Sequence, residues 1–308
     1  MKTSCVPLPR FRIGLRALLW CASALAVPYA AVAEAGSSEA DRHRSHGVQS
    51  QLAIRWIGGP TLHLQFGPIS IVTDPVLGDS FRMIDPNTGE QNAEHRRLGA
   101  IPEQAEQDAQ LVLLSHDHPD HFDDAAFALY HDSARFLVPS SQETGLRARG
   151  ISQLDPLAWH QKRDILKDGF RVSITALPAQ HSECSELNAV LGEVNAYWLE
   201  FHAEGYRRSL FWTGDSFFVP GLSVWPDRPD VFVPHLGAVG AGGPFGAVSM
   251  NGQEALEFSR LVDPKAVLPI HHSTFSLYRE PISVFLAAAQ GEAWDVLILE
   301  EGGSITIE

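Results

Sequence analysis

The stretch Ser115-His116-Asp117-His118-Pro119-Asp120-His121-Phe122 decides how this sequence is interpreted. It directly follows Leu111–Leu114, a short aliphatic run typical of a strand buried on both faces. Three imidazoles and the Asp120 carboxylate fall within six residues, and Pro119 opposes a regular helix through them. These side chains are ligands for zinc, and for iron or manganese in related sites. The stretch therefore predicts a metal-binding loop at the end of a buried strand.

Further candidate ligands follow other strand-like runs. His181 comes after 170–177, Asp215 after 209–213 and His271 after 266–270. Polar groups at strand ends commonly build the active sites of α/β folds. With the first stretch they supply five histidines and two aspartates, enough for two metal ions bridged by one carboxylate.

The order of these residues resembles the ligand motifs of the metallo-β-lactamase superfamily, over roughly residues 52–308. The resemblance implies an α/β fold, the four-layer αββα sandwich, with a dinuclear site at one edge of its sheets. It implies two divalent cations, with zinc preferred and manganese or iron as alternatives. The implied ligands are His116, His118 and His181 for one metal, Asp120, His121 and His271 for the other, and Asp215 as the bridge.

Subfamily features bear on the substrate. The runs Pro178–His181 and Ile270–Phe275 resemble the branch that contains ascorbate-phosphate lactonases and N-acyl-phosphatidylethanolamine phospholipase D enzymes. An Asp at the bridging position, rather than Cys, resembles the hydrolase branches of the superfamily more than the true zinc β-lactamases. Two departures are Gly59, where many members have His, and Pro234–Gly237, where the phospholipase has a Pro-x-Gly-Ala-Tyr run.

We therefore expect a hydrolase that cleaves a lactone, carboxylic ester or phosphodiester in a small-molecule or lipid-like substrate. The nucleophile would be water activated by the metal ions. Asp120 is expected to orient that water or accept its proton. A β-lactam-hydrolysing enzyme and a non-catalytic metal-binding protein of the same fold are the alternatives.

For three residues around this set, the sequence leaves alternative roles open. Asp74, in Thr73-Asp74-Pro75, either orients a ligand histidine or only forms a turn. His235 follows a buried strand and either contacts the substrate and protonates its leaving group, or packs structurally. His272 competes with His271 for one ligand role; along an extended chain it would point the other way, flanking the site.

The N-terminal 33 residues have the layout of a signal peptide. Residues 1–16 carry four cations and no acid, an apolar run follows, and Ala31-Val32-Ala33 supplies the small residues of a cleavage site. Residues 34–50 are polar and read as a flexible leader. We expect an exported protein, periplasmic or secreted, with no stable membrane span after cleavage. The sequence does not indicate an oligomeric state.

Charge excludes one class of partner. The 308 residues contain 23 Lys plus Arg, only four of them Lys, and 37 Asp plus Glu, for a net charge of −14. Loss of the four N-terminal cations makes the mature chain more acidic, at −18. Nucleic-acid binding needs clustered cations, so we expect none.

Residues 51–308 are expected to form one domain, since no repeat or long linker divides them. Residues 78–108 and 182–192 are expected to be irregular, the latter as a loop bordering the site. Strands are expected at 52–57, 61–66, 69–73, 111–114, 135–138, 170–177, 196–202, 209–213, 231–234, 266–270, 296–299 and 304–307. Helices are expected at 123–131, 141–149, 253–262 and 281–289.

Overall fold

The computed structural model describes residues 50–84, 91–103, 108–182, 184–241 and 246–308. The expected signal peptide (1–33) and nearly all of the expected leader (34–50) lie outside the described residues. Within the described ranges, no helix combines the length and apolar character needed to cross a membrane.

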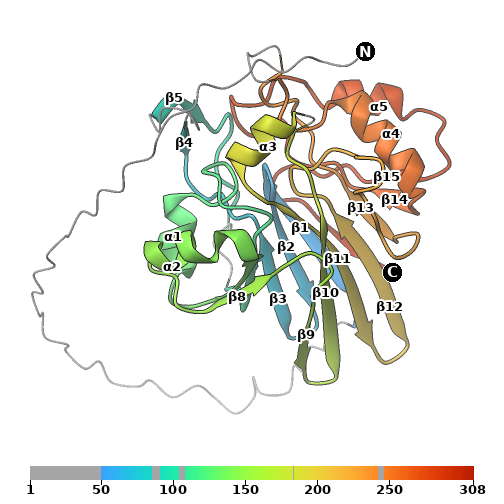
Figure 1. Ribbon diagram of the computed structural model, residues 1–308. Coiled ribbons are helices and arrows are strands. Elements are labelled where there is room, and N and C mark those ends of the chain that lie inside the picture. Colours follow the sequence, from blue (N-terminus) through green and yellow to red (C-terminus); the bar gives the residue numbers. More distant parts are fainter. Residues whose placement is uncertain (1–49, 85–90, 104–107, 183, 242–245) are drawn as a thin grey trace, which may run out of the picture.

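Two seven-stranded sheets form the framework of the described residues (Figure 1). The first sheet has the order β16 (Ser304–Ile307), β1 (Leu52–Gly58), β2 (Thr61–Phe66), β3 (Ile69–Thr73), β6 (Leu111–Leu113), β7 (Arg135–Pro139), β8 (Leu154–Leu157). The second has the order β15 (Asp295–Val296), β14 (Ala266–Val267), β13 (Val231–Val233), β12 (Tyr206–Trp212), β11 (Asn195–Ala203), β10 (Phe170–Pro178), β9 (Lys162–Lys167).

The main core lies between the two sheets. In β1, alternate residues Leu52, Ile54 and Trp56 are buried in it, as the two-residue period of a strand requires. Trp212 of β12 belongs to the same core from the second sheet and is fully buried. Apolar burial of this kind supplies the dominant favourable term in folding.

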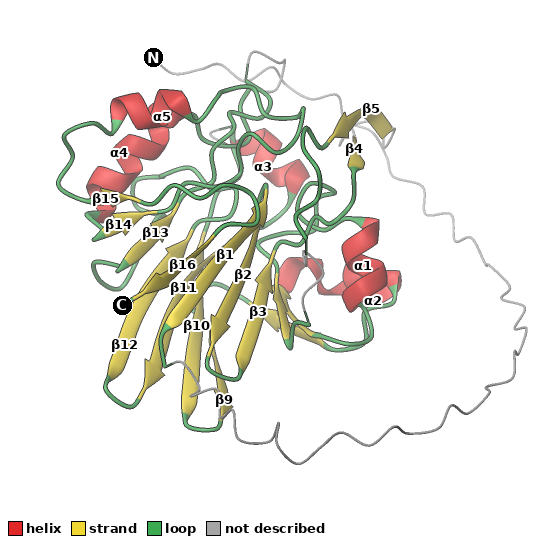
Figure 2. Cartoon of the chain, turned by 180° about the vertical axis from the view of Figure 1, so that it is seen from behind, coloured by secondary structure: helices red, strands yellow, loops and turns green. Residues whose placement is uncertain are grey.

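Helices cover the outer faces of both sheets. α1 (Asp124–Tyr130) and α2 (Glu143–Arg149), the latter preceded by a 3₁₀ turn at Ser140–Gln142, lie beside the first sheet (Figure 1). On the other side of the molecule, α4 (Gly252–Val262) and α5 (Ser283–Ala288) cover the second sheet, as the view from behind also shows (Figure 2). The four-layer αββα sandwich is therefore confirmed.

The structure contains elements that the sequence did not predict. The segment expected to be irregular contains a hairpin of β4 (Ser80–Ile84) and β5 (Gln91–Arg96). The expected loop at 182–192 contains α3 (Ser185–Leu191). The edge strands β8 and β9 were also missed, β9 because its charged residues and largely exposed pattern hide the strand signal.

The strand directions bring the candidate residues together. β3 runs parallel to β6, and β12, β13 and β14 run parallel to one another. β10 points the same way as β12, because each is antiparallel to β11. The carboxyl ends of these strands meet at one edge of the sandwich, where Asn195 N donates to Ser115 O at 3.0 Å across the two sheets.

Candidate metal centre

The first group of ligand atoms comes from both sheets. His116 and His118 lie in the loop after β6, and His181 follows β10. His181 Nε2 lies 3.1 Å from His116 Nε2 and 3.1 Å from His118 Nδ1. Two nitrogens that ligate one tetrahedral zinc at about 2.0–2.1 Å would lie about 3.3 Å apart. The spacing of these three nitrogens therefore fits a single metal ion.

Hydrogen bonds behind the rings determine which nitrogens face inward. Ser115 Oγ donates to Asp74 Oδ2 at 2.5 Å, so its oxygen can accept from His116 Nδ1 at 2.9 Å. His181 Nδ1 is 2.8 Å from Val248 O, an acceptor. In both rings the remaining nitrogen, Nε2, is then free of its proton and able to bind a cation.

The second group consists of Asp120, His121 and His271. His121 Nδ1 contacts Asp74 Oδ2 at 2.7 Å, and His271 Nδ1 contacts Leu236 O at 2.8 Å. The inward Nε2 atoms of both histidines lie 3.8 Å from Asp120 Oδ2. Asp74 therefore lies behind a candidate ligand, as one of the two sequence interpretations expected.

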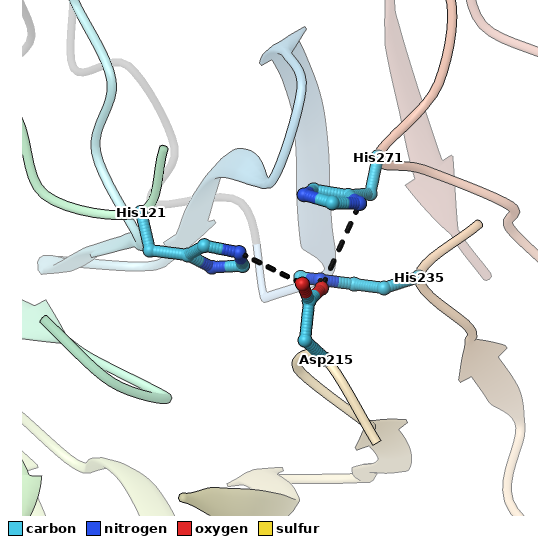
Figure 3. A group of neighbouring side chains, drawn as sticks. All are labelled: His121, Asp215, His235 and His271. Carbon is cyan, nitrogen blue, oxygen red and sulfur yellow. Dashed lines mark hydrogen bonds and ion pairs between the residues drawn. The ribbon is translucent and has the colours of Figure 1, made fainter. Parts of the chain in front are cut away.

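Asp215 lies beside this second group. Its Oδ2 is 3.3 Å from His121 Nε2, and its Oδ1 is 3.0 Å from His235 Nδ1 and 3.6 Å from His271 Nδ1. Figure 3 shows this carboxylate with the rings of His121, His235 and His271 around it. The loop from β12 thus delivers an anionic group into a cluster of imidazoles.

Three buried polar atoms at the second group indicate whether a cation would fit there. Asp120 Oδ1, His121 Nε2 and His271 Nε2 are buried and form no hydrogen bond within the described part of the chain, although the Asp215 carboxylate lies 3.3 Å from His121 Nε2. A buried polar atom left unpaired costs about 1–3 kcal/mol. All three atoms belong to the implied ligands of the second metal, and a divalent cation would satisfy them together. The donor set therefore fits metal ions.

The electrostatics of the two groups differ. Burial and neighbouring imidazoles hold the pKa of His116 well below its usual range, and burial lowers the pKa of His118 to about 3. Burial alone would lower the pKa of His121 too, but the carboxylates of Asp215, Asp120 and Asp74 raise it well above the usual value. Burial therefore disfavours the charged forms of His116 and His118 in the first group, whereas a metal ion at the second must displace a proton from His121.

Unusual backbone conformations shape the loops that carry two of these residues. His271 has φ +62°, the left-handed region that non-glycine residues rarely adopt. Gly214 has φ +54°, and a Cβ there would lie 2.5 Å from Ser115 Cβ. The Thr213-Gly214-Asp215 turn therefore requires glycine to bring Asp215 close to the loop after β6.

A cavity of about 870 Å³ opens onto the candidate ligands His118, Asp120, His181 and Asp215. The β4–β5 hairpin forms part of its wall. Its apolar lining includes Phe81, Met83, Leu191 and Val248, and its cationic lining includes Arg82 and Arg149. Ligand pockets commonly have this size and mixture of groups.

Two residues lie differently from expectation. His235 is fully buried, its Nε2 accepts from Trp212 Nε1 at 2.7 Å, and its Nδ1 faces Asp215. It cannot contact substrate or protonate a leaving group, because both ring nitrogens have protein partners.

His272 contacts Ser273 Oγ and Pro269 O rather than a candidate ligand. The left-handed turn at His271 replaces the extended chain assumed for it.

The cavity wall and Trp212 were not predicted from the sequence. The run Ser80-Phe81-Arg82-Met83 alternates polar and apolar residues, a strand signal that the surrounding polar residues obscured. Trp212 precedes the Thr213-Gly214-Asp215 turn in a buried strand. The role of Trp212 depends on its contact with His235, and no local sequence pattern predicts a contact between residues that far apart.

Comparisons with known proteins relate this chain to one family. The model of the β-lactamase superfamily domain matches residues 70–272. An uncharacterized Mycobacterium tuberculosis protein is 28% identical over 262 residues, which cover 80% of this chain and 66% of that protein. The chain thus spans just under two thirds of that relative's length.

Two other relatives carry functional names. The N-acyl-phosphatidylethanolamine-hydrolyzing phospholipase D 1 of Caenorhabditis elegans is 26% identical, over 76% of this chain and 68% of that protein. A metal-dependent hydrolase of Methylobacterium nodulans is 24% identical, over 83% of this chain and all of that protein.

A solved structure shares the fold. The isothiocyanate hydrolase from Delia radicum gut bacteria superposes with a TM-score of 0.64 at 18% identity, over 82% of this chain and 98% of that one.

Proposed function

From the premise that this chain belongs to the metallo-β-lactamase superfamily and is a metal-dependent hydrolase, we propose that it uses two metal ions to cleave an ester-type bond. The observation that supports this proposal is a pair of clusters of potential ligand atoms, one of His116, His118 and His181 and one that contains His121, Asp215 and His271. Asp120 Oδ2 lies 3.8 Å from His121 Nε2 and from His271 Nε2, and Asp120 lines the adjacent cavity together with His118, His181 and Asp215. In four of these histidines, Nδ1 contacts a protein oxygen that can accept its proton, and this leaves Nε2 facing the site; the four are His116, His181, His121 and His271.

His116, His118 and His181 would hold one cation, and Asp120, His121 and His271 the other, with Asp215 between them. When bound, the cations supply Lewis-acid catalysis and a water of lowered pKa. Zinc suits this nitrogen-rich donor set, with manganese or iron as alternatives.

Asp120 is the candidate for handling the proton of the attacking water. It lines the cavity, next to the proposed metal positions. Burial would raise its pKa, but His121 and His271 beside it lower the pKa to about 2. The carboxylate is then ionised at neutral pH and acts only as an acceptor.

The cavity supports an ester-type, small-molecule or lipid-like substrate. Apolar residues Phe81, Met83, Leu191 and Val248 provide surface for a hydrophobic portion, next to the groups that would carry out hydrolysis. The activity in the name of the nematode relative, hydrolysis of an N-acyl phospholipid, is a phosphodiester cleavage. We propose no nucleic-acid partner, because the chain is acidic.

The test is a screen of metal-loaded protein against generic phosphodiester, lactone, carboxylic ester and β-lactam substrates. We expect turnover of one ester-type class, lost in His116→Ala and Asp120→Ala. Turnover of the β-lactam nitrocefin alone would replace this proposal with β-lactam hydrolysis. Failure to bind zinc, manganese or iron would overturn the two-metal mechanism.

We also propose export, from the signal-like N-terminal residues. N-terminal sequencing of protein recovered outside the cytoplasm should begin at Glu34. Recovery of only cytoplasmic protein that retains Met1 would contradict export.

A further inference from the structure

A buried chain of three side chains runs from the main core to the candidate metal centre. Trp212 Nε1 lies 2.7 Å from His235 Nε2, and His235 Nδ1 lies 3.0 Å from Asp215 Oδ1. Trp212 and His235 are fully buried and Asp215 is 1% exposed. The three residues come from the ends of the neighbouring parallel strands β12 and β13.

The chemistry of tryptophan fixes the proton on His235. An indole N–H is a donor and never an acceptor, so His235 Nε2 must accept and carries no proton. A neutral imidazole has one N–H, which is then on Nδ1. The only group of the chain that faces Nδ1 within hydrogen-bond distance in the described structure is the Asp215 carboxylate, which accepts.

This arrangement also excludes His235 as a metal ligand in the structure described. His235 is near enough to join a cluster with His121, Asp215 and His271. However, a ligating nitrogen must be free of its proton, and the one nitrogen that faces the centre carries the N–H. The other nitrogen is already bound to Trp212.

We propose that His235 is a positioning residue: in the tautomer selected by Trp212, it donates from Nδ1 to Asp215 Oδ1 and holds that carboxylate between the two ligand groups. This inference rests on the proposed function, which assigns Asp215 the bridging role. With Oδ1 held from behind, Oδ2 faces His121 Nε2 at 3.3 Å. The ring of His235 also stacks on His271, at 5.1 Å between centroids and 11° between planes, which restricts rotation of both rings.

The test separates hydrogen bonding from packing by comparing His235→Asn with His235→Leu. The Asn amide nitrogen occupies nearly the place of His Nδ1 and keeps a donor toward Asp215. Leu has a similar size and no donor.

Trp212→Phe removes the donor that selects the tautomer of His235. Trp198→Phe is its control, since Trp198 packs on Phe211 in another part of the core. His63→Asn is the matched histidine control, because His63 bonds Ser70 Oγ outside the site.

Metal-free protein of each variant is titrated with Co²⁺, read from the visible ligand-field spectrum and from competition with a chelator. Outer partners of metal ligands typically change affinity by about 10- to 100-fold. We expect His235→Leu to weaken binding by that factor and alter the spectrum. His235→Asn should stay within about 3-fold of the parent, and Trp212→Phe should alter the spectrum where Trp198→Phe and His63→Asn do not.

Equal losses in His235→Asn and His235→Leu would show a packing role and overturn the inference. Parental binding by His235→Leu would overturn it as well. If His235→Leu does not fold, as judged by circular dichroism, the comparison of Trp212→Phe with Trp198→Phe decides the question: identical spectra in these two overturn the inference. Parent protein that binds no Co²⁺, Zn²⁺ or Mn²⁺ would instead refute the proposed function, so the two failures are distinguishable.

Discussion

The carboxylate of Asp74 and the imidazole of His121 lie 2.7 Å apart, Oδ2 to Nδ1, although 47 residues separate them in the chain. Both side chains are fully buried. The same carboxylate accepts from Ser115 N and Ser115 Oγ, at 2.7 and 2.5 Å. Asp74 therefore ties the end of β3 to the loop after β6 and leaves His121 Nε2 facing the candidate metal.

Asp74→Asn should weaken metal binding by about 10- to 100-fold, since the amide cannot accept from every donor around it. Chelator competition measures the change. Asp230→Asn is the matched control: Asp230 also accepts from the backbone and hydroxyl of one serine, Ser209, at 2.7 and 3.1 Å. Asp230 precedes β13, at the end of that strand away from His235. Equal metal affinity in the two variants would contradict the orienting role of Asp74.

Removing one ligand from each group should remove one metal ion. His181→Ala takes a nitrogen from the first group, and His271→Ala takes one from the second. Elemental analysis should find about two metal ions per chain in the parent and about one in each variant. His202→Ala, which changes a histidine of β11 paired with Glu200, should keep both. A parent chain with a single metal ion would contradict the dinuclear arrangement.

Gly214→Ala should both destabilise the protein and displace Asp215. The substitution puts a Cβ 2.5 Å from Ser115 Cβ and places alanine at φ +54°. Gly205→Ala is the control, since Gly205 has φ +69° with no atom within 4 Å of the added Cβ. Both pay about 1–2 kcal/mol for left-handed backbone, and overpacking adds about 1–3 kcal/mol at Gly214 alone. Denaturant unfolding and metal content measure this, and equal losses in the two variants would refute the steric explanation.

Acid should destabilise the metal-free protein partly through His63. Burial, and then the charge of Arg55, lowers the pKa of His63 from 6.5 to about 4 in the folded chain. Between these values the unfolded chain binds a proton that the folded chain does not. Stability is therefore full above about pH 6.5, falls as the pH drops toward 4, and levels off below that.

His63→Gln removes this titration and should flatten that part of the profile by about 1–3 kcal/mol. The measurement is the unfolding free energy of chelator-treated parent and variant at pH 7, 5.5 and 4. Parallel profiles for the two proteins would show that His63 does not contribute.

Much of the fold follows from local patterns in the sequence. The runs at Thr61–Phe66, Ile69–Thr73 and Ser304–Ile307 form strands with the expected bounds, because turn residues precede each run. The β4–β5 hairpin was missed because surrounding polar residues obscured the alternation at 80–83, and α3 because a helix of seven residues carries little periodic signal. Their positions depend on packing against the rest of the chain.

By itself, the sequence determined the superfamily, the four-layer fold and the candidate ligands, since each ligand lies in a dense motif or directly after a strand. Only the tertiary structure decided which nitrogen of each imidazole faces inward. The fixing contacts join distant segments: Asp74 with His121, Val248 with His181, and Leu236 with His271. The change of His235 from a candidate acid to a buried donor has the same reason, because the Trp212 indole that selects its tautomer lies 23 residues away.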